Sequence, residues 1–230
     1  MSKGKKLNIA LSGSTGRMGV SIQNLIDQDP LFKSNFQVMH TLNRSLKIQD
    51  WKEQEIDLVI DFSLPEVFGE VFEWCKNNNK PLLTGTTGFK NPEKFFKTEG
   101  LSFALMHSGN YSLGVASLID ALKSFKKLSK KATVWMEDYH HIHKKDAPSG
   151  TALKIADAVS KNFGTTPKIN DVRAGSIFGI HKVHIATEKE WVTLSHTALS
   201  REVFSEGALN SAAWLVEQEP GLYTLEDFLN

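Results

Sequence analysis

The fold is decided by the stretch Leu7-Asn8-Ile9-Ala10-Leu11-Ser12-Gly13-Ser14-Thr15-Gly16-Arg17-Met18-Gly19 near the start of the chain. Its first five residues form a short apolar run, which predicts a buried strand. Glycines then recur at every third position, and apolar residues such as Ile22 and Ile26 follow at helical spacing. A strand, a glycine turn and a helix in this order are typical of the opening unit of a parallel sheet.

The glycine turn also predicts a binding function. Glycines let a backbone approach a pyrophosphate, and the N-terminus of the following helix supplies amide donors. An ordinary tight turn would use the same glycines, so the interpretation depends on the position of this turn at the start of an alternating sheet. We expect a dinucleotide to contact Gly13, Ser14, Thr15, Gly16, Arg17 and Met18.

The alternation of strand and helix continues along the first half of the chain. Short apolar runs predict strands over 36–41, 58–61, 81–84 and 103–106. Strands that alternate with helices form a parallel sheet covered on both faces. The sequence therefore predicts an α/β fold with a Rossmann-type domain.

After about Gly114 the pattern changes. We expect a helix through Leu122, a strand from Thr133 that ends near Asp138, and a helix over 149–163. This order no longer alternates regularly, which indicates a second domain of the α+β type.

Two alternating segments, 181–187 and 191–196, flank a short polar turn and predict an antiparallel hairpin. A final helical pattern over 207–216 could return to the first domain. The expected domains are 1–113 completed by 203–230, which binds the dinucleotide, and 114–202.

Composition excludes several classes of function. The chain has 230 residues and a net charge of +1, so its overall charge does not favour binding to nucleic acid. No apolar run is long enough to span a bilayer, and the one after the basic start is too short for a signal peptide. The single cysteine, Cys75, fits a reduced, cytoplasmic compartment.

The end of the second predicted strand indicates which nicotinamide cofactor is used. An acidic residue there holds the ribose 2′-hydroxyl, whereas an arginine accommodates a 2′-phosphate. The segment Thr41-Leu42-Asn43-Arg44-Ser45 has no carboxylate and places Arg44 at this point. We expect NADPH as the preferred cofactor and NADH as an alternative, unless Arg44 is an ordinary solvated arginine.

Two small, polar loops follow later strands at the edge of the sheet where ligands bind. They suit a nicotinamide amide or a ribose, although loops of this composition also occur without ligands. Their residues are Gly85, Thr86 and Thr87 in the first loop, and Ser108, Gly109, Asn110 and Tyr111 in the second.

The chemistry is predicted by the segment 137–152, which reads EDYHHIHKKDAPSGTA. Histidine titrates near neutral pH and can deliver a proton, and a nearby lysine stabilises developing charge. A helix that starts at Ser149 would bind a carboxylate at its free amide groups. We expect a polar loop that carries the histidines and Lys144, and a reductase that adds hydride from one side and a proton from the other.

Histidines at 140, 141 and 143 could instead bind a metal ion. Adjacent histidines in an extended segment point to opposite faces, and no second cluster of Cys or His closes a site, so no metal is expected. A solvated basic loop is the other alternative. Ser149 lacks the strand, elbow and glycine pattern of a hydrolase nucleophile.

These residues together resemble the 4-hydroxy-tetrahydrodipicolinate reductase family, also called dihydrodipicolinate reductase, of the bacterial diaminopimelate and lysine pathway. The resemblance covers nearly the whole chain. Its most specific part is His140-His141 with Lys144 and Asp146-Ala147-Pro148-Ser149-Gly150-Thr151-Ala152. Supporting matches are the glycine turn, Asp61-Phe62-Ser63, Gly85-Thr86-Thr87-Gly88-Phe89, Asn110-Tyr111-Ser112, Arg173-Ala174-Gly175, Gly179, His181, His196 and Arg201.

The resemblance implies a role for each part of the site. His140 would be the proton donor with Lys144 as its catalytic partner, while His141, Gly150 and Thr151 would hold a carboxylate of the substrate. The cofactor would lie on the glycine turn, Arg44 and the two polar loops. It also implies a second domain with an open mixed or antiparallel sheet that builds a homotetramer.

Two departures from the family pattern affect these expectations. The segment between Phe163 and Arg173 is shorter than in many members of the family, so a dimer is an alternative to the tetramer. Asn43 stands where an acidic residue often precedes the arginine, which disfavours effective use of NADH. Two other functions also stay open: a two-domain dehydrogenase for a different carbonyl or imine, and an inactive cofactor-binding sensor.

Overall fold

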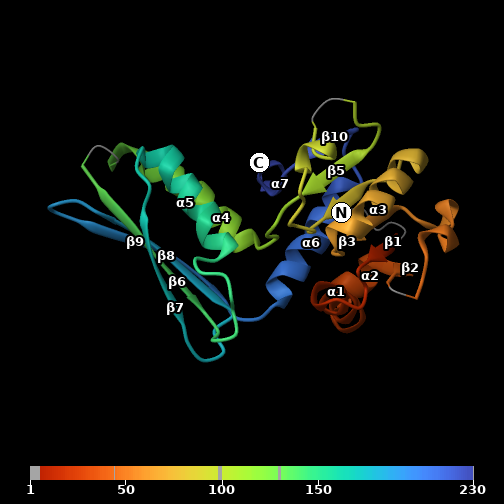
Figure 1. Cartoon of the computed structure of the whole chain (residues 1–230), viewed down its shortest axis with the longest axis horizontal. Coiled ribbons are helices and arrows are strands. Elements are labelled where there is room, and N and C mark those ends of the chain that lie inside the picture. Colours follow the sequence, from red (N-terminus) through yellow and green to blue (C-terminus); the bar gives the residue numbers. More distant parts are fainter. Residues whose placement is uncertain (1–5, 44, 98–99, 129–130, 230) are drawn as a thin grey trace. The chain divides into compact units, whose positions relative to one another are not determined.

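The computed structural model describes residues 6–43, 45–97, 100–128 and 131–229, which form two compact units (Figure 1). The first unit runs up to Tyr111 and resumes at Phe204, and the second is the continuous segment Ser112–Val203. None of the helices in these described ranges combines the length and apolar character that crossing a bilayer requires.

A six-stranded parallel sheet forms the centre of the first unit, with the order β10-β5-β4-β3-β1-β2. Its strands are β1 (Leu7–Ser12), β2 (Phe36–Leu42), β3 (Leu58–Asp61), β4 (Leu82–Thr84), β5 (Ala104–His107) and β10 (Gly221–Tyr223). The strand order reverses between β1 and β3, which is where open α/β sheets bind ligands outside their carboxyl ends. The predicted Rossmann-type sheet is confirmed.

Local sequence signals explain the ends of the helices of this unit. Asp29 caps one helix by accepting hydrogen bonds from Leu31 and Phe32, Pro65 occupies the first turn of another, and Asn79 ends it at a φ of 49°. The helices are α1 (Arg17–Gln28), α2 (Pro30–Asn35), α3 (Pro65–Asn78), α6 (Glu202–Leu215) and α7 (Leu225–Leu229). The helix predicted over 207–216 is therefore confirmed as part of a longer one, α6.

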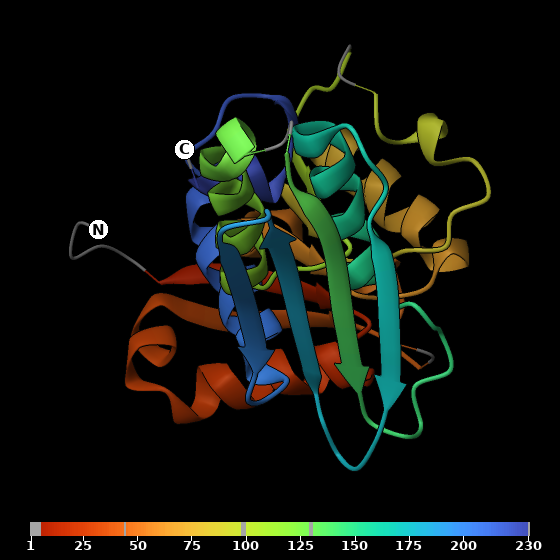
Figure 2. The ribbon, with the colours of Figure 1, turned by 90° about the vertical axis from the view of Figure 1, so that its left-hand side faces the viewer.

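The second unit is a four-stranded mixed sheet with two helices on one face (Figure 2). The strand order is β7-β6-β8-β9, in which only the pair β6 and β7 is parallel. The elements are α4 (Leu113–Leu122), β6 (Thr133–His140), α5 (Gly150–Phe163), β7 (Lys168–Arg173), β8 (Gly179–Ala186) and β9 (Trp191–Ala198). The predicted hairpin and open mixed sheet are confirmed, whereas β7 was not predicted as a strand.

The helix-covered face of this sheet is apolar at one end and ionisable at the other. Alternate residues of β6 are buried on this face, first Val134 and Met136 in the hydrophobic core and then Asp138 and His140. The neighbouring strands repeat the change, because Val183 of β8 is followed toward the same end by its alternate residue His181, and Leu194 of β9 by His196. A core face that turns polar in register on three strands marks a site.

Strand β6 is longer than the sequence predicted. Its ladder with β8 reaches Tyr139 and its ladder with β7 reaches His140. The expectation that His140 lies in a polar loop is therefore wrong, because pairing on both sides extends the strand. His140 is instead the last residue of a central strand.

Candidate active site

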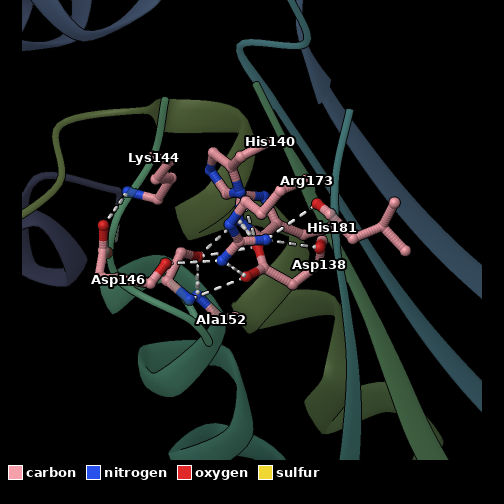
Figure 3. A network of polar contacts seen from close by, with 9 residues as sticks. Asp138, His140, Lys144, Asp146, Ala152, Arg173 and His181 are labelled. Carbon is pink, nitrogen blue, oxygen red and sulfur yellow. Dashed lines mark hydrogen bonds and ion pairs between the residues drawn. The ribbon is translucent and has the colours of Figure 1, made fainter. Parts of the chain in front are cut away.

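His140 is held at the end of β6 with 6% of its surface exposed. Its Nδ1 atom lies 3.0 Å from Oδ1 of Asp138, which comes from the same face of the same strand and is fully buried. The alignment is not that of a good hydrogen bond, so the contact is an ion pair when the imidazole is protonated. Figure 3 shows these side chains among the polar groups around them.

The Asp138 carboxylate is the centre of this polar network. Oδ2 accepts hydrogen bonds from the Ser149 amide at 2.8 Å and from Nη2 of Arg173 at 3.1 Å, and Oδ1 accepts one from the Ser149 hydroxyl at 2.9 Å. Burial raises the pKa of the Asp138 carboxyl, but the contacts with His140 and Ser149 outweigh this effect and leave its pKa well below its usual range. Asp138 is therefore a carboxylate at neutral pH.

His181 completes the cluster from β8. Its Nε2 atom lies 3.4 Å from Oδ1 of Asp138, and its ring meets that of His140 with centroids 5.3 Å apart. Burial lowers the pKa of His181 to about 4, although the charge of Asp138 acts in the opposite direction. His181 is therefore neutral at neutral pH.

No second cluster of Cys or His was expected to close a metal site, but the structure brings His181 from β8 next to His140. Asp138, His140 and His181 bring potential ligand atoms within 4.8 Å of one another. Both oxygens of Asp138 are already used by a backbone amide, a hydroxyl and a guanidinium. A metal ion would have to displace the positive charge of Arg173, so this donor set suits a proton-handling site better than a metal site.

The loop after β6 brings Lys144 to the start of α5. Nζ of Lys144 lies 3.0 Å from Oδ1 of Asp146. Burial acts to raise the pKa of the Asp146 carboxyl, but the hydrogen bond with Lys144 and the Gly150 amide lower it overall. A carboxylate is thus already stabilised where the lysine meets the helix N-terminus, the place where Gly150 and Thr151 were predicted to bind one.

His141 follows directly after β6 and is half-buried. Burial lowers the pKa of His141, and the nearby His140 and His143 lower it further. The structure therefore gathers His140, His141, Lys144, Gly150 and Thr151 within the second unit, around β6 and the first turn of α5.

In the first unit, the glycine turn has the geometry that its spacing predicted. Gly13 has a φ of +76°, and a Cβ atom there would lie 2.3 Å from the carbonyl oxygen of Phe62. A Cβ atom on Gly19 would lie 2.3 Å from the carbonyl oxygen of Gly13, so this glycine permits close packing of α1 against the turn. The amides of Gly13 and Ser14 donate to Leu42 at the end of β2.

The turn lies on a cavity of about 810 Å³. Its other walls come from the ends of β2 and β3 and the segments after them, and include Asn43, Lys47 and Ser63. Asn43 accepts hydrogen bonds from the amides of Ser45 and Leu46, which shapes the loop after β2. Arg44 lies outside the described residues, so its predicted role remains a proposal.

The loop Gly85-Thr86-Thr87 follows β4 and is fixed by Asp61, the buried last residue of β3. Asp61 accepts hydrogen bonds from the hydroxyls of Ser63 at 2.6 Å, Thr84 at 2.8 Å and Thr86 at 2.7 Å. Gly85 is required here, because a Cβ atom would lie 2.0 Å from the ring of Phe62. The carboxyl ends of β3 and β4 are thus locked together.

The second polar loop, after β5, is tied to the same place. Ser108 donates to the carbonyl of Asn110 at 2.6 Å, and the hydroxyl of the buried Tyr111 donates to the carbonyl of Thr84 at 2.8 Å. The two predicted cofactor loops therefore lie at the carboxyl ends of the sheet, although among described residues the cavity lining includes neither 85–87 nor 108–111.

Sequence reasoning assigned no role to Asp138, Arg173, Gly179 or Asp61. A signal existed for the first two: charged residues that occupy core-facing positions of strands are rarely buried without a function. Gly179 matches the family pattern, but only the structure shows that a Cβ atom there would lie 3.1 Å from Nε2 of His140.

Comparison with known proteins gives a consistent result for both halves of the chain. The family description "Dihydrodipicolinate reductase, N-terminus" matches residues 7–102, and "Dihydrodipicolinate reductase, C-terminus" matches residues 114–229. A 4-hydroxy-tetrahydrodipicolinate reductase of Bdellovibrio bacteriovorus is 38% identical over 227 residues, which cover 98% of this chain and 97% of that protein. The enzyme of the same name from Rickettsia akari is 34% identical, with 97% of each chain covered.

A solved structure shares the fold. Dipicolinate-bound dihydrodipicolinate reductase from Paenisporosarcina sp. TG-14 superimposes with a TM-score of 0.76 at 19% identity, covering 97% of this chain and 99% of that one. The diaminopimelate dehydrogenase of C. glutamicum superimposes less well, with a TM-score of 0.59 at 11% identity. Both comparisons concern the fold alone.

Proposed function

The chain belongs to the dihydrodipicolinate reductase family, whose members are NAD(P)H-dependent oxidoreductases. We propose that it reduces 4-hydroxy-tetrahydrodipicolinate, via dihydrodipicolinate, to tetrahydrodipicolinate in lysine and diaminopimelate biosynthesis. The observation that carries the proposal is the buried His140 held against Asp138, next to the lysine and helix start that already stabilise a carboxylate.

The second unit supplies the binding and proton-transfer groups. Lys144, His141 and the first amides of α5, those of Gly150 and Thr151, bind a carboxylate of the cyclic substrate. His140 delivers a proton to the ring carbon next to the one that receives hydride. Its burial keeps water away from the transferred proton, and Lys144 stabilises the negative charge that develops on the substrate.

A nicotinamide cofactor supplies the hydride. The residues of the first unit fit it, because Gly13, Thr15 and Gly16 line the cavity next to the N-terminus of α1. Gly13, Ser14, Thr15, Gly16, Arg17 and Met18 contact the pyrophosphate in this proposal. The loops at 85–87 and 108–111 contact the nicotinamide half.

NADPH is the preferred donor in this proposal, with NADH also accepted. Asn43 has no charge to repel a 2′-phosphate, its amide oxygen is occupied by the loop amides, and Lys47 lines the same cavity. Arg44 provides the main positive charge. Exchange of Asn43 for Asp keeps the acceptor for the loop amides and adds a carboxylate, so Asn43→Asp is expected to shift the preference toward NADH.

The functional unit is proposed to be a cytoplasmic homo-oligomer, a tetramer or a dimer. The face of the second sheet opposite α4 and α5 carries an aromatic cluster in which the rings of Trp135, His184 and Trp191 lie 4.9 to 5.6 Å apart. Trp191 is 63% exposed in the single chain. An exposed tryptophan that packs on further aromatic rings is typical of a protein interface, so Trp191→Lys is expected to lower the mass seen by light scattering.

The test of the activity is the loss of reduced-nicotinamide absorbance when the substrate is formed in the cuvette from pyruvate and aspartate semialdehyde. We expect substrate-dependent oxidation of NADPH. His140→Gln should lower kcat by at least about a hundredfold with little change in the affinity for substrate, since general acids contribute at least that much. His143→Gln, an exposed histidine of the same loop, is the control and should keep its activity. Unchanged kcat in His140→Gln would exclude the proton-donor role.

A further inference from the structure

We propose that Asp138 and Arg173 act as an opposed pair of positioning residues that orient His140 and set the pH range over which it holds its transferable proton. The proposal rests on the proposed role of His140 as the proton donor. Asp138 favours the protonated imidazole and Arg173 limits that effect.

The two nitrogens of His140 have different surroundings. Nδ1 faces the buried carboxylate of Asp138 at 3.0 Å. Nε2 faces the bare backbone of Gly179 on β8, where even a methyl group would approach it to 3.1 Å. The carboxylate beside Nδ1 stabilises the charge of the protonated ring, and Nε2 carries the proton that is given to the substrate.

Asp138 alone would hold this proton too firmly. An unshared carboxylate in a dry site strongly favours a protonated histidine, and a donor that binds its proton too tightly is a weak acid. The structure shares the charge of Asp138 among the Ser149 amide, the Ser149 hydroxyl and Arg173. The guanidinium is the only permanently charged group among these donors.

Arg173 is placed to act on both the carboxylate and the loop. It pairs with His140 across the ladder of β6 and β7. Nη2 donates to Oδ2 of Asp138 at 3.1 Å and to the carbonyl of Asp146 at 2.7 Å, and Nη1 donates to the carbonyl of Asp138 at 3.2 Å. Arg173 thereby connects the end of β6 to the loop that carries Lys144.

Other titratable groups near His140 come from each element packed around it. Neutral His181 of β8 touches both Asp138 and the His140 ring, and His196 of β9 stacks on His181 with centroids 6.1 Å apart. His141 and Lys144 lie on the loop after β6, where Lys144 adds positive charge and the lowered pKa of His141 favours its neutral form. Because these groups stay in place in both variants below, the effect of the pair can be separated from theirs.

Loss of water from 4-hydroxy-tetrahydrodipicolinate gives dihydrodipicolinate. A bound nicotinamide would supply hydride, with its two electrons, to one carbon of the unsaturated bond of dihydrodipicolinate, and the adjacent carbon takes the proton from Nε2 of His140. The C–H and N–H bonds break, two C–H bonds form, the cofactor leaves oxidised, and His140 regains a proton from water.

The test is the pH dependence of kcat in the full-length enzyme. For the wild type, kcat should fall at high pH, where the general acid has lost its proton. This fall is the alkaline limb of the pH profile. Asp138→Asn removes the negative charge, so this alkaline limb should move about one pH unit lower. Arg173→Gln removes the positive charge, so the limb should move higher. Asp138→Glu should restore the wild-type limb.

Opposite shifts in Asp138→Asn and Arg173→Gln distinguish a charge effect from a loss of structure, which would lower kcat equally at every pH. The fraction of folded enzyme is measured by circular dichroism, and Arg173→Gln carries the test if Asp138→Asn does not fold. If the alkaline limb of the kcat profile does not move in these variants, or moves in the same direction in both, the inference is overturned. If His140→Gln itself keeps full turnover, the proposed function fails instead, before the pair is tested.

Discussion

Each unit of the molecule contains a fully buried carboxylate at the ligand-binding end of its sheet, and the two are held by different kinds of donors. Asp61 ends β3, and the donors that the structure assigns to it are the hydroxyls of Ser63, Thr84 and Thr86. Asp138 lies near the end of β6 and faces a backbone amide, a hydroxyl, a guanidinium and two imidazoles.

The difference teaches what each carboxylate can do. A hydroxyl can donate or accept, so the group around Asp61 can rearrange around a neutral partner. A backbone amide and a guanidinium can only donate, so the group around Asp138 requires an anion. Asp61 therefore fixes the shape of the loops around it, whereas Asp138 also sets the charge of its surroundings.

The largest expected effect comes from exchanging each carboxylate for an amide. In Asp138→Asn, an NH₂ group replaces one of the two oxygens and faces groups that can only donate hydrogen bonds. This exchange should lower the free energy of unfolding by about 3 to 5 kcal/mol. Asp61→Asn should lower it by about 1 to 2 kcal/mol, because its hydroxyls can turn. Urea denaturation of both variants measures the difference, and equal losses would contradict the distinction between the two sites.

The second effect is the acid sensitivity of the second unit. The pKa of His181 is about 4 in the folded protein, below its ordinary value of 6.5, so between these values the unfolded chain binds the extra proton. The free energy of unfolding should therefore fall as pH drops from about 6.5 to about 4. The pKa of the Asp138 carboxyl is also lower in the folded protein than its ordinary value of 3.8. The free energy of unfolding should therefore fall further as the pH drops below 3.8.

Hydrogen exchange at pH 7 and pH 5, read for peptides of β6 and β8, should show this loss of protection in the second unit. His181→Gln keeps a polar group near Asp138 but cannot titrate, so it should remove most of the dependence on pH in this window. His143→Gln, at an exposed position, should behave like the wild type. If His181→Gln kept the full pH dependence, that dependence would belong to another titratable group.

The same contrast explains what the sequence could predict. The strands of the first unit and its glycine turn follow from local patterns, because apolar runs and close backbone approach leave direct traces in residue type. Positions such as His140 and Lys144 were found because chemically active residues are crowded into one segment. Arg173, Gly179 and His181 contact that segment through the pairing of β7 and β8 with β6, and strand register between distant segments cannot be read from one of them alone.

A third effect compares single hydroxyl donors to the two carboxylates. Thr86→Val removes one of three hydroxyls from Asp61 without changing the shape of the side chain, and should cost about 1 kcal/mol of unfolding free energy. Ser149→Ala removes a donor to Asp138 and also the cap that accepts from the Ala152 amide, so about 2 kcal/mol is expected. Thermal unfolding shows which variant loses more stability. A larger loss in Thr86→Val than in Ser149→Ala would contradict this expectation.

The smallest expected effect concerns an exposed carboxylate at the edge of the second site. Asp146 pairs with Lys144 at 3.0 Å and meets the start of α5, so it occupies groups that the proposed function assigns to a carboxylate of the substrate. Asp146→Asn should release Lys144 and lower KM for the substrate by about twofold to fivefold with kcat unchanged, the range that an exposed ion pair supports. Asp157→Asn is the matched control, because Asp157 pairs with Lys161 at 2.7 Å farther along the same helix and should leave KM as it is. A rise in KM for Asp146→Asn would show instead that Asp146 holds Lys144 in its binding position, which would make this pair a structural support like Asp61 rather than a competitor of the substrate.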